Sequence, residues 1–256
     1  SFEDSYFIPS SSSAINLKIY EPMVSGHGST ISASVLPSGG SSISEIGFCY
    51  SYYNSQPTIY DNITSIGDDS ITFQYTYPHS LDDSIMYIRA YATSFEGLAY
   101  TEVKQIVRPQ LYLGKEYQGG IIFYLDETGE HGLIAAMEDL GNFPYGTCSF
   151  SGPYSEAIGT GYQNSLEIVS ACSQTTAASE ALAYESNGYD DWYLPSYFEL
   201  YEMYSAIGRG SLFGNIGGFE DSWYWSSSHT GNTAHNVNFG DGSVNYNVSE
   251  GAAFPI

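Results

Sequence analysis

Two pairs of adjacent carboxylates in this sequence have the chemistry of a calcium site: Asp190 with Asp191, and Glu220 with Asp221. Calcium takes about six to eight oxygen ligands, and carboxylates in loops supply them well. The sequence contains no EF-hand loop, however, and aspartates in turns also accept hydrogen bonds from nearby backbone amides. Three interpretations therefore stay open for these four residues: a structural calcium site, a calcium ion that bridges to a bound sugar, or stabilisation of turns. We predict no other cofactor.

A second stretch, residues 229–241, is rich in amide and imidazole side chains and follows Trp223 closely. Carbohydrate sites combine a flat aromatic ring with planar amides and carboxylates, which bind the sugar hydroxyls. We expect Trp223 to be exposed, and Trp192 and Trp225 to pack in the core. The ligand-binding residues predicted on this basis are Trp223, His229, Asn232, His235, Asn236, Asn238 and Asp241.

Motifs for catalysis are absent from the sequence. It has no Gly-x-Ser-x-Gly elbow, no His-Glu-x-x-His motif and no phosphate-binding loop. Its five histidines lie apart, and none belongs to a recognisable nucleophile motif. We therefore predict that the protein is not an enzyme, although a pair of glycosidase carboxylates brought together by folding would be invisible at this level.

Charge excludes several classes of partner. The 256 residues include six Lys or Arg and 29 Asp or Glu, a formal net charge of −23. Residues 1–109 hold 11 acidic and four basic side chains, and residues 110–256 hold 18 and two. Such a chain repels phosphate groups, so we expect neither nucleic acid nor an anionic membrane surface as a partner.

The remaining composition is typical of an exported, β-rich protein, with 25 Tyr, 27 Gly and few Lys. No apolar run approaches the roughly 18 residues of a membrane span, so we expect no direct membrane insertion. The first residues show no signal-peptide pattern, so we expect the sequence to be that of a mature or trimmed chain. We expect an extracellular protein at the cell surface, with a lipid anchor in an outer membrane as one means of attachment.

The three cysteines fit no zinc-binding spacing. We predict a disulfide between Cys148 and Cys172, with Cys49 buried as a free thiol. Three buried thiols are the alternative.

The chain is long enough for two domains after a polar leader, residues 1–13. Residues 14–108 show period-two alternation at intervals near ten residues, which predicts an antiparallel sandwich. Pro109 interrupts strand pairing within a junction at residues 107–114. Strands are expected at 14–19, 30–35, 45–50, 70–75, 86–91 and 99–103.

Residues 109–256 change to an α+β pattern. A hairpin is expected from strands 119–126 and 131–136. Asn164 is the expected N-cap of a helix over 165–171, and a second helix is expected over 176–185. The third begins with a capping box of Ser196 and Glu199. Short strands are expected at 223–227, 233–239 and 243–248.

Part of the first domain resembles a known module. Residues 81–92 are similar to the tyrosine-corner segment of fibronectin type III domains, with Tyr87 as the corner tyrosine and Leu81 as its core partner. Segments 47–51 and 94–100 resemble the variant common in exported Bacteroidetes proteins. The resemblance implies an immunoglobulin-like spacer without a site of its own.

Most of the second domain resembles the C-terminal domain of the Legionella collagen-like adhesin and its bacterial relatives. The matching segments are residues 113–125, 131–136, 158–161, 187–196, 199–200, 203–204 and 224–228, with Asn164 and Cys172. Residues 194–199 and 225–227 also resemble elements of the C-type lectin-like superfold. The resemblance implies a surface-exposed binding domain with glycans as the leading ligands.

Two departures limit what the resemblance carries. Relatives often end in an Arg-containing strand, whereas residues 251–256 contain no arginine. Sulfated glycans, associated with the adhesin, require a cationic cluster, and residues 110–256 offer only Lys115 and Arg209. We therefore predict a non-catalytic adhesin that binds a neutral glycan or another host or bacterial surface ligand. The alternative is a structural component of a fimbria or surface complex that binds protein partners.

Overall fold

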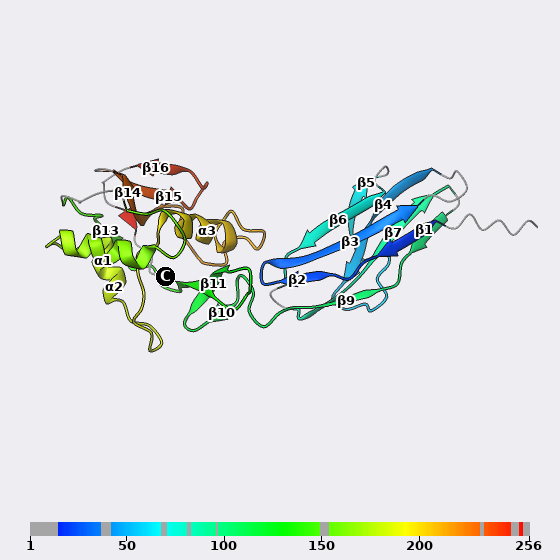
Figure 1. The fold of residues 1–256 in the computed structure, drawn as a ribbon, viewed down its shortest axis with the longest axis horizontal. Helices are drawn as coiled ribbons and strands as arrows, with labels where there is room; N and C mark the ends of the chain where they lie inside the picture. Colours follow the sequence, from blue (N-terminus) through cyan, green and yellow to red (C-terminus); the bar gives the residue numbers. More distant parts are fainter. Residues whose placement is uncertain are drawn as a thin grey trace, which may run out of the picture. The chain divides into compact units, whose positions relative to one another are not determined.

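The computed structural model describes residues 15–36, 42–67, 71–80, 83–95, 97–148, 154–230, 233–246 and 251–252. The chain divides into two compact units, Ser1–Pro109 and Gln110–Ile256 (Figure 1). The predicted leader, the candidate ligand residue Asn232 and the expected core partner Leu81 lie outside the described residues.

The N-terminal unit is built from two antiparallel sheets. In the first, β3 pairs with β1 and β2 along one edge and with β6 along the other. In the second, β4 and β7 pair at the centre, β5 borders β4, and β8 and β9 border β7. The first sheet comprises β1 (Asn16–Ile19), β2 (Met23–Ser25), β3 (Gly28–Leu36) and β6 (Thr72–Tyr77). The second comprises β4 (Ile43–Ser51), β5 (Asn62–Gly67), β7 (Ile85–Ser94), β8 (Gly97–Tyr100) and β9 (Lys104–Val107).

Alternate residues of these strands form one core between the sheets. Ile31, Ala33 and Val35 of β3 are buried there, facing Ile88 and Ala90 of β7. Because side chains alternate along a strand, this period-two pattern makes a sandwich, and the predicted β-sandwich is confirmed. The other face of β7 carries Tyr87, which is half-buried.

A free thiol lies buried on the outer side of the second sheet. The Cys49 Sγ lies 3.5 Å from the carbonyl oxygen of Pro57, in the loop after β4. Arg89 donates to the same carbonyl, and its guanidinium lies 3.9 Å from the ring centroid of Tyr100. Burial raises the pKa of the Cys49 thiol, which keeps it protonated and unreactive.

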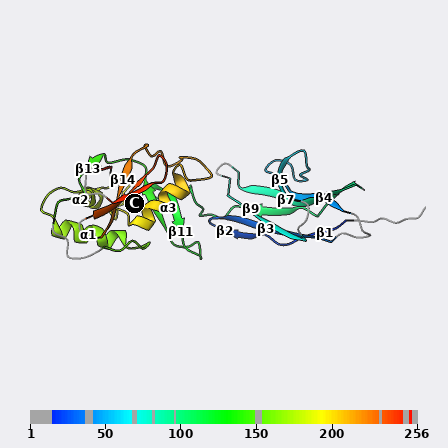
Figure 2. The same cartoon turned by 90° about the horizontal axis from the view of Figure 1, so that it is seen from above.

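The C-terminal unit combines helices with two sheets (Figures 1 and 2). One sheet has the order β10 (Glu116–Tyr117), β11 (Gly120–Leu125) and β12 (Gly132–Ala136). The other has the order β13 (Asn142–Phe143), β17 (Gly251–Ala252), β14 (Trp223–Thr230), β15 (Thr233–Asn238) and β16 (Val244–Tyr246). The helices that the structure describes are α1 (Gly161–Ala171), α2 (Ala177–Ala183) and α3 (Tyr197–Ile207). Each is too short to cross a lipid bilayer, within the described ranges.

Helix α3 links the two sheets. Its buried residues Leu200, Met203 and Ile207 share a core with Phe123 of β11 and Val237 of β15. The predicted capping box is present, because the Ser196 hydroxyl accepts from the Glu199 amide and the Glu199 carboxylate accepts from the Ser196 amide. This reciprocal pairing satisfies amides that the first helical turn leaves open.

The other two helices differ from their predicted bounds. Helix α1 begins at Gly161, so Asn164 lies inside it and is not its N-cap. The Asn164 side chain instead donates to the carbonyl of Ser155 at 2.7 Å and to the Ser227 hydroxyl at 3.2 Å. Helix α2 starts as expected after Thr176, which forms a capping box with Ser179, but it ends at Ala183.

Candidate functional site

Three of the predicted ligand-binding residues are buried. His229, His235 and Asn236 are only 1%, 2% and 4% exposed, and they lie within β14 and β15 and not on loops. Their polar atoms cannot reach a ligand in this arrangement. The prediction that these three side chains bind a ligand from loops is therefore wrong.

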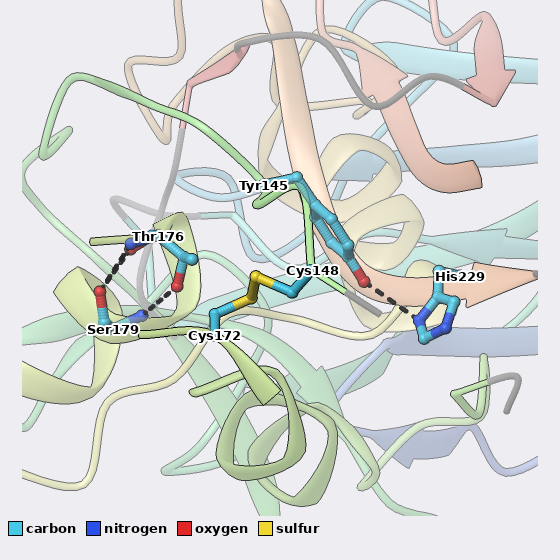
Figure 3. The surroundings of a disulfide bond; sticks show 6 residues. All are labelled: Tyr145, Cys148, Cys172, Thr176, Ser179 and His229. Carbon is cyan, nitrogen blue, oxygen red and sulfur yellow. Dashed lines mark hydrogen bonds between the residues drawn. A yellow bond between two sulfur atoms is a disulfide. The ribbon is translucent and has the colours of Figure 1, made fainter. Parts of the chain in front are cut away.

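The two histidines have structural partners instead. The Nδ1 of His229 lies 3.3 Å from the Tyr145 hydroxyl (Figure 3). The ring centroid of His229 lies 4.1 Å from that of Tyr154. The Nδ1 of His235 lies 3.0 Å from a carboxylate oxygen of Glu156. Burial lowers the pKa of His235, and the Glu156 charge opposes this effect. Both imidazoles thus help to join β14 and β15 to the loops before α1.

The other predicted ligand residues in the described part of the chain remain nearer the surface. Trp223 is half-buried and pairs across the ladder with Asn238. The Asn238 amide oxygen accepts from Gly240 at 2.7 Å, and the Asp241 carboxylate accepts from Ser243 at 2.9 Å. These bonds stabilise the turn after β15. Trp192 and Trp225 are buried in the core, as predicted.

The four candidate calcium ligands are not gathered together. Asp221 forms an ion pair with Arg209, whereas Asp191 lines a cleft elsewhere in the unit. Glu220 and Asp190 are exposed. Among the described residues, no three His, Cys, Asp or Glu side chains lie close enough together to hold a metal ion.

Cys148 and Cys172 are joined by a disulfide, with their Cα atoms 5.4 Å apart (Figure 3). The bridge ties the end of α1 to the segment after β13. A Cβ added at Gly146 would lie 3.0 Å from the Cys172 sulfur and 3.1 Å from the Thr176 methyl group. The bridge is therefore packed closely against the start of α2.

The C-terminal unit contains a cleft of about 540 Å³. It lies between the β10–β12 hairpin sheet and the segment 189–193, which leads into α3. Its volume falls within the range of about 300–1,000 Å³ that is usual for small-molecule sites. The lining residues are Leu111, Tyr117, Gln118, Ile122, Leu125, Glu130, His131, Gly132, Leu133, Ile134, Tyr189, Asp191, Trp192 and Tyr193.

Two tight turns shape one edge of this cleft. Gln118 and Gly119, with φ values of 52° and 89°, join β10 to β11. Asn187 and Gly188, at 53° and 83°, form a similar turn closed by a bridge between Ser186 and Tyr189. Positive φ at both central residues marks type I′ geometry. A Cβ added at Gly119 would lie 2.8 Å from the Asn187 amide nitrogen, so the two turns are in contact. Gln118 holds a conformation that few side chains adopt, a form of strain that clusters at functional sites.

The aromatic residues of the cleft use their polar atoms internally. The indole N–H of Trp192 donates to the carbonyl of Tyr189 at 3.2 Å. The Tyr193 hydroxyl forms a hydrogen bond with Glu199, and burial, followed by that carboxylate, raises the pKa of Tyr193. Trp192 is only 1% exposed, so the ring surface that the cleft offers comes from Tyr193, Tyr189 and Tyr117.

The charged lining of the cleft is acidic. Glu130 and Asp191 are both exposed, and neither forms an ion pair among the described residues. The described lining includes no Lys or Arg. Nearby, the Lys115 ammonium lies 5.9 Å from the Tyr117 ring centroid, but it donates to the carbonyl of Gln110 at 2.6 Å. The cleft combines aromatic faces, an amide, an imidazole and two carboxylates.

Sequence reasoning identified Asp191 but missed the rest of this cleft. Its walls come from three segments, around residues 117–118, 130–134 and 189–193. One signal was available, because Tyr189 and Tyr193 flank the predicted core residue Trp192 on a Gly/Asp-rich loop.

No family model matches the chain, and no curated protein matches its sequence. Similar solved structures include a DUF3823 family protein from Bacteroides ovatus, 9% identical over 37% of this chain and 56% of that chain, with a TM-score of 0.33. This chain thus spans about half of the Bacteroides protein. Another is the sixth fibronectin type III domain of a human fibronectin type III domain containing protein 3, 18% identical over 42% of this chain and 97% of that one, with a TM-score of 0.29. The structural neighbours therefore include a fibronectin type III domain and a Bacteroides protein, and likenesses of this strength carry no argument about function.

Proposed function

We propose that this protein is a non-catalytic binding protein and that its C-terminal unit holds a glycan without acidic groups. The observation that carries the proposal is the cleft of about 540 Å³, whose aromatic rings stand beside an amide and two carboxylates. Ring faces pack on the C–H side of a sugar, and planar polar groups bind its hydroxyls. Anionic sugars would be repelled by Glu130 and Asp191.

The family resemblance supports the same proposal independently of the cleft. The segments that resemble the adhesin domain include residues 187–196, which supply one wall of the cleft, and residues 113–125, which supply the opposite turn. On this proposal the C-terminal unit is a C-type lectin-like adhesin domain, carried at the cell surface by a fibronectin type III-like spacer. The cleft replaces residues 223–241 as the proposed ligand site.

A glycan array on the whole chain tests the proposal. We expect neutral glycans to bind and sulfated glycans to fail. Tyr117→Ala should weaken binding about tenfold, since an aromatic contact contributes roughly 1–1.5 kcal/mol. Tyr60→Ala is the matched control, because Tyr60 is an exposed tyrosine in the N-terminal unit. Binding should persist in a chelator, because the candidate calcium ligands lie apart. An array without hits, on protein with a cooperative unfolding transition, would refute the proposal.

A second candidate function, assembly with a protein partner, is favoured by the surface of α1. Tyr162, Leu166 and Val169 are exposed at spacings of four and three residues, so they share one face of the helix. The buried face holds Gly161, Asn164 and Ser165 beside Ile168. The helix thus presents apolar side chains outward and packs largely through small or polar ones, which is unusual for a monomer surface.

Substitution on this face distinguishes the two functions. Leu166→Asp should abolish capture of a surface-complex partner and leave glycan binding unchanged. Ala171→Asp adds the same charge at an exposed position of the same helix, five residues after Leu166 and so on another side of it, and should change neither. Partner capture that survives Leu166→Asp would remove the argument for assembly.

A further inference from the structure

The acidic groups of the cleft indicate a more specific ligand chemistry, on the premise that the cleft binds a glycan. Glu130 and Asp191 both line it, and neither is neutralised by an ion pair among the described residues. They stand beside the rings of Tyr117, Tyr189, Trp192 and Tyr193. An aromatic lining with carboxylates attracts a ligand cation through the ring quadrupoles and through charge.

We propose that the sugar unit bound in this cleft carries a free, protonated amine. The inference rests on the proposed glycan-binding function and narrows it to amino sugars without an N-acetyl group. The ammonium would lie against a ring face and within reach of Asp191 or Glu130, and the sugar hydroxyls would meet Gln118 and His131.

The use of hydrogen bonds inside the cleft supports an ammonium over other groups. The Tyr193 hydroxyl is bound to Glu199, so this half-buried ring presents its π-face more than its polar atom, as the rings of Tyr117 and Tyr189 can. Trp192 is 1% exposed, so its ring lies beneath the cleft surface and does not itself contact a ligand. The two carboxylates can only accept hydrogen bonds when ionised. An ammonium supplies three donors and a charge, and it meets both requirements at once.

A metal cation fits the same residues less well. Calcium needs about six to eight oxygen ligands, whereas no three metal-binding side chains come together within the described residues. An ammonium needs only one or two carboxylates and a ring. Lys115, whose ammonium lies 5.9 Å from the Tyr117 ring centroid, provides an intramolecular example of such a contact beside the cleft.

Two tetrasaccharides with the same linkage test the inference, one of glucosamine and one of N-acetylglucosamine. Binding of each to the whole chain is measured by calorimetry at pH 6.0, where an amine with a pKa near that of an α-amino group is protonated. We expect the amine form to bind about tenfold more tightly at low salt, from a partly desolvated cation–π contact and the two carboxylates. The preference should shrink in 1 M salt, because added salt screens charges.

Matched variants distinguish specific binding in the cleft from general electrostatic attraction to an acidic protein. Asp191→Asn and Glu130→Gln should each reduce the preference for the amine roughly two- to fivefold. Asp190→Asn and Glu127→Gln remove the same charge from exposed neighbours that do not line the cleft, and they should leave the preference unchanged.

Each outcome decides between the inference and its premise. Equal binding of both tetrasaccharides would overturn the amine inference and leave the glycan-binding proposal standing. An amine preference that Asp190→Asn weakens as much as Asp191→Asn would also overturn it, since general charge would then explain the binding. Failure of both tetrasaccharides to bind would overturn the inference, and the glycan array would then decide the proposed function separately.

Discussion

Replacement of Glu199 by alanine should destabilise the C-terminal unit more than any other single loss of a carboxylate. The side chain is fully buried at the start of α3. Its carboxylate accepts from the amides of Ser196 at 2.7 Å and Gly159 at 2.6 Å, and it forms a further bond with the Tyr193 hydroxyl. One acidic group therefore holds the starts of α1 and α3 and one wall of the cleft.

The expected loss in the free energy of unfolding follows from the hydrogen-bond donors that have no acceptor in the variant. Each buried donor left without a partner costs about 1–3 kcal/mol. Two amides and a hydroxyl would lose their acceptor. Gly159 is exposed, so water can reach its amide, and the unit would no longer desolvate a carboxyl group; both effects offset part of the loss. We expect Glu199→Ala to reduce the free energy of unfolding by about 3 kcal/mol.

Tryptophan fluorescence during urea unfolding measures this effect in the right unit. The C-terminal unit contains all three tryptophans, Trp192, Trp223 and Trp225. Their emission therefore does not report unfolding of the N-terminal sandwich. Glu202→Ala is the control, because Glu202 lies in the same helix and is not buried. That variant should stay within about 0.5 kcal/mol of the parent. A loss below about 1 kcal/mol for Glu199→Ala, or equal losses for both variants, would refute the reasoning.

Three further predictions concern the bridge, a buried imidazole and a strand glycine. Cys148 and Cys172 are 24 positions apart. In the loop-entropy model, reduction of their disulfide should lower the free energy of unfolding measured by tryptophan fluorescence by about 3 kcal/mol. An unchanged urea midpoint in dithiothreitol would contradict this. Burial lowers the folded-state pKa of His235. The stability that its neutral imidazole contributes is therefore present above the unfolded pKa of about 6.5, and it is lost as pH falls through the folded pKa. Tryptophan-reported stability should therefore depend less on pH below 6.5 in His235→Gln than in the parent, and parallel profiles would argue against a neutral buried imidazole. A Cβ at Gly47 would overlap the Thr64 carbonyl, so Gly47→Ala should lower the free energy of unfolding of the N-terminal sandwich by about 2 kcal/mol or more, seen by circular dichroism, with tryptophan emission unaffected.

Local signals in the sequence predicted much of the secondary structure. The period-two runs of residues 30–35 and 86–91 became central strands because one face of each had a core to meet. The capping box at Ser196 was readable because its residues are three positions apart in the chain. Short, mostly exposed strands such as β2 and β5 carry no such alternation, and the sequence did not predict them.

The functional site was less predictable for two physical reasons. Histidine and asparagine usually favour exposed loops, but His229 and His235 find Tyr145 and Glu156, residues more than 70 positions earlier, as partners. No local sequence pattern predicts such pairings. The cleft likewise brings Tyr117 beside residues 189–193 across more than 70 positions of sequence. Aromatic residues on both segments were visible, but their convergence is a property of the fold.

The seam between β14 and the segment before α3 has a consequence for how this unit could diversify. The ladder between β14 and β15 breaks between Trp225 and His229, where the Ser227 amide and hydroxyl both donate to the carbonyl of Pro195 and the Ser228 hydroxyl donates to that of Ser155. Bulkier side chains at these buried serines would force the backbones apart. The cleft residues Gln118, Glu130 and Asp191 take no part in this seam. Substitutions at those three positions can therefore change the ligand preference while the buried serines preserve the backbone arrangement. Relatives that share the serines are expected to differ in what they bind.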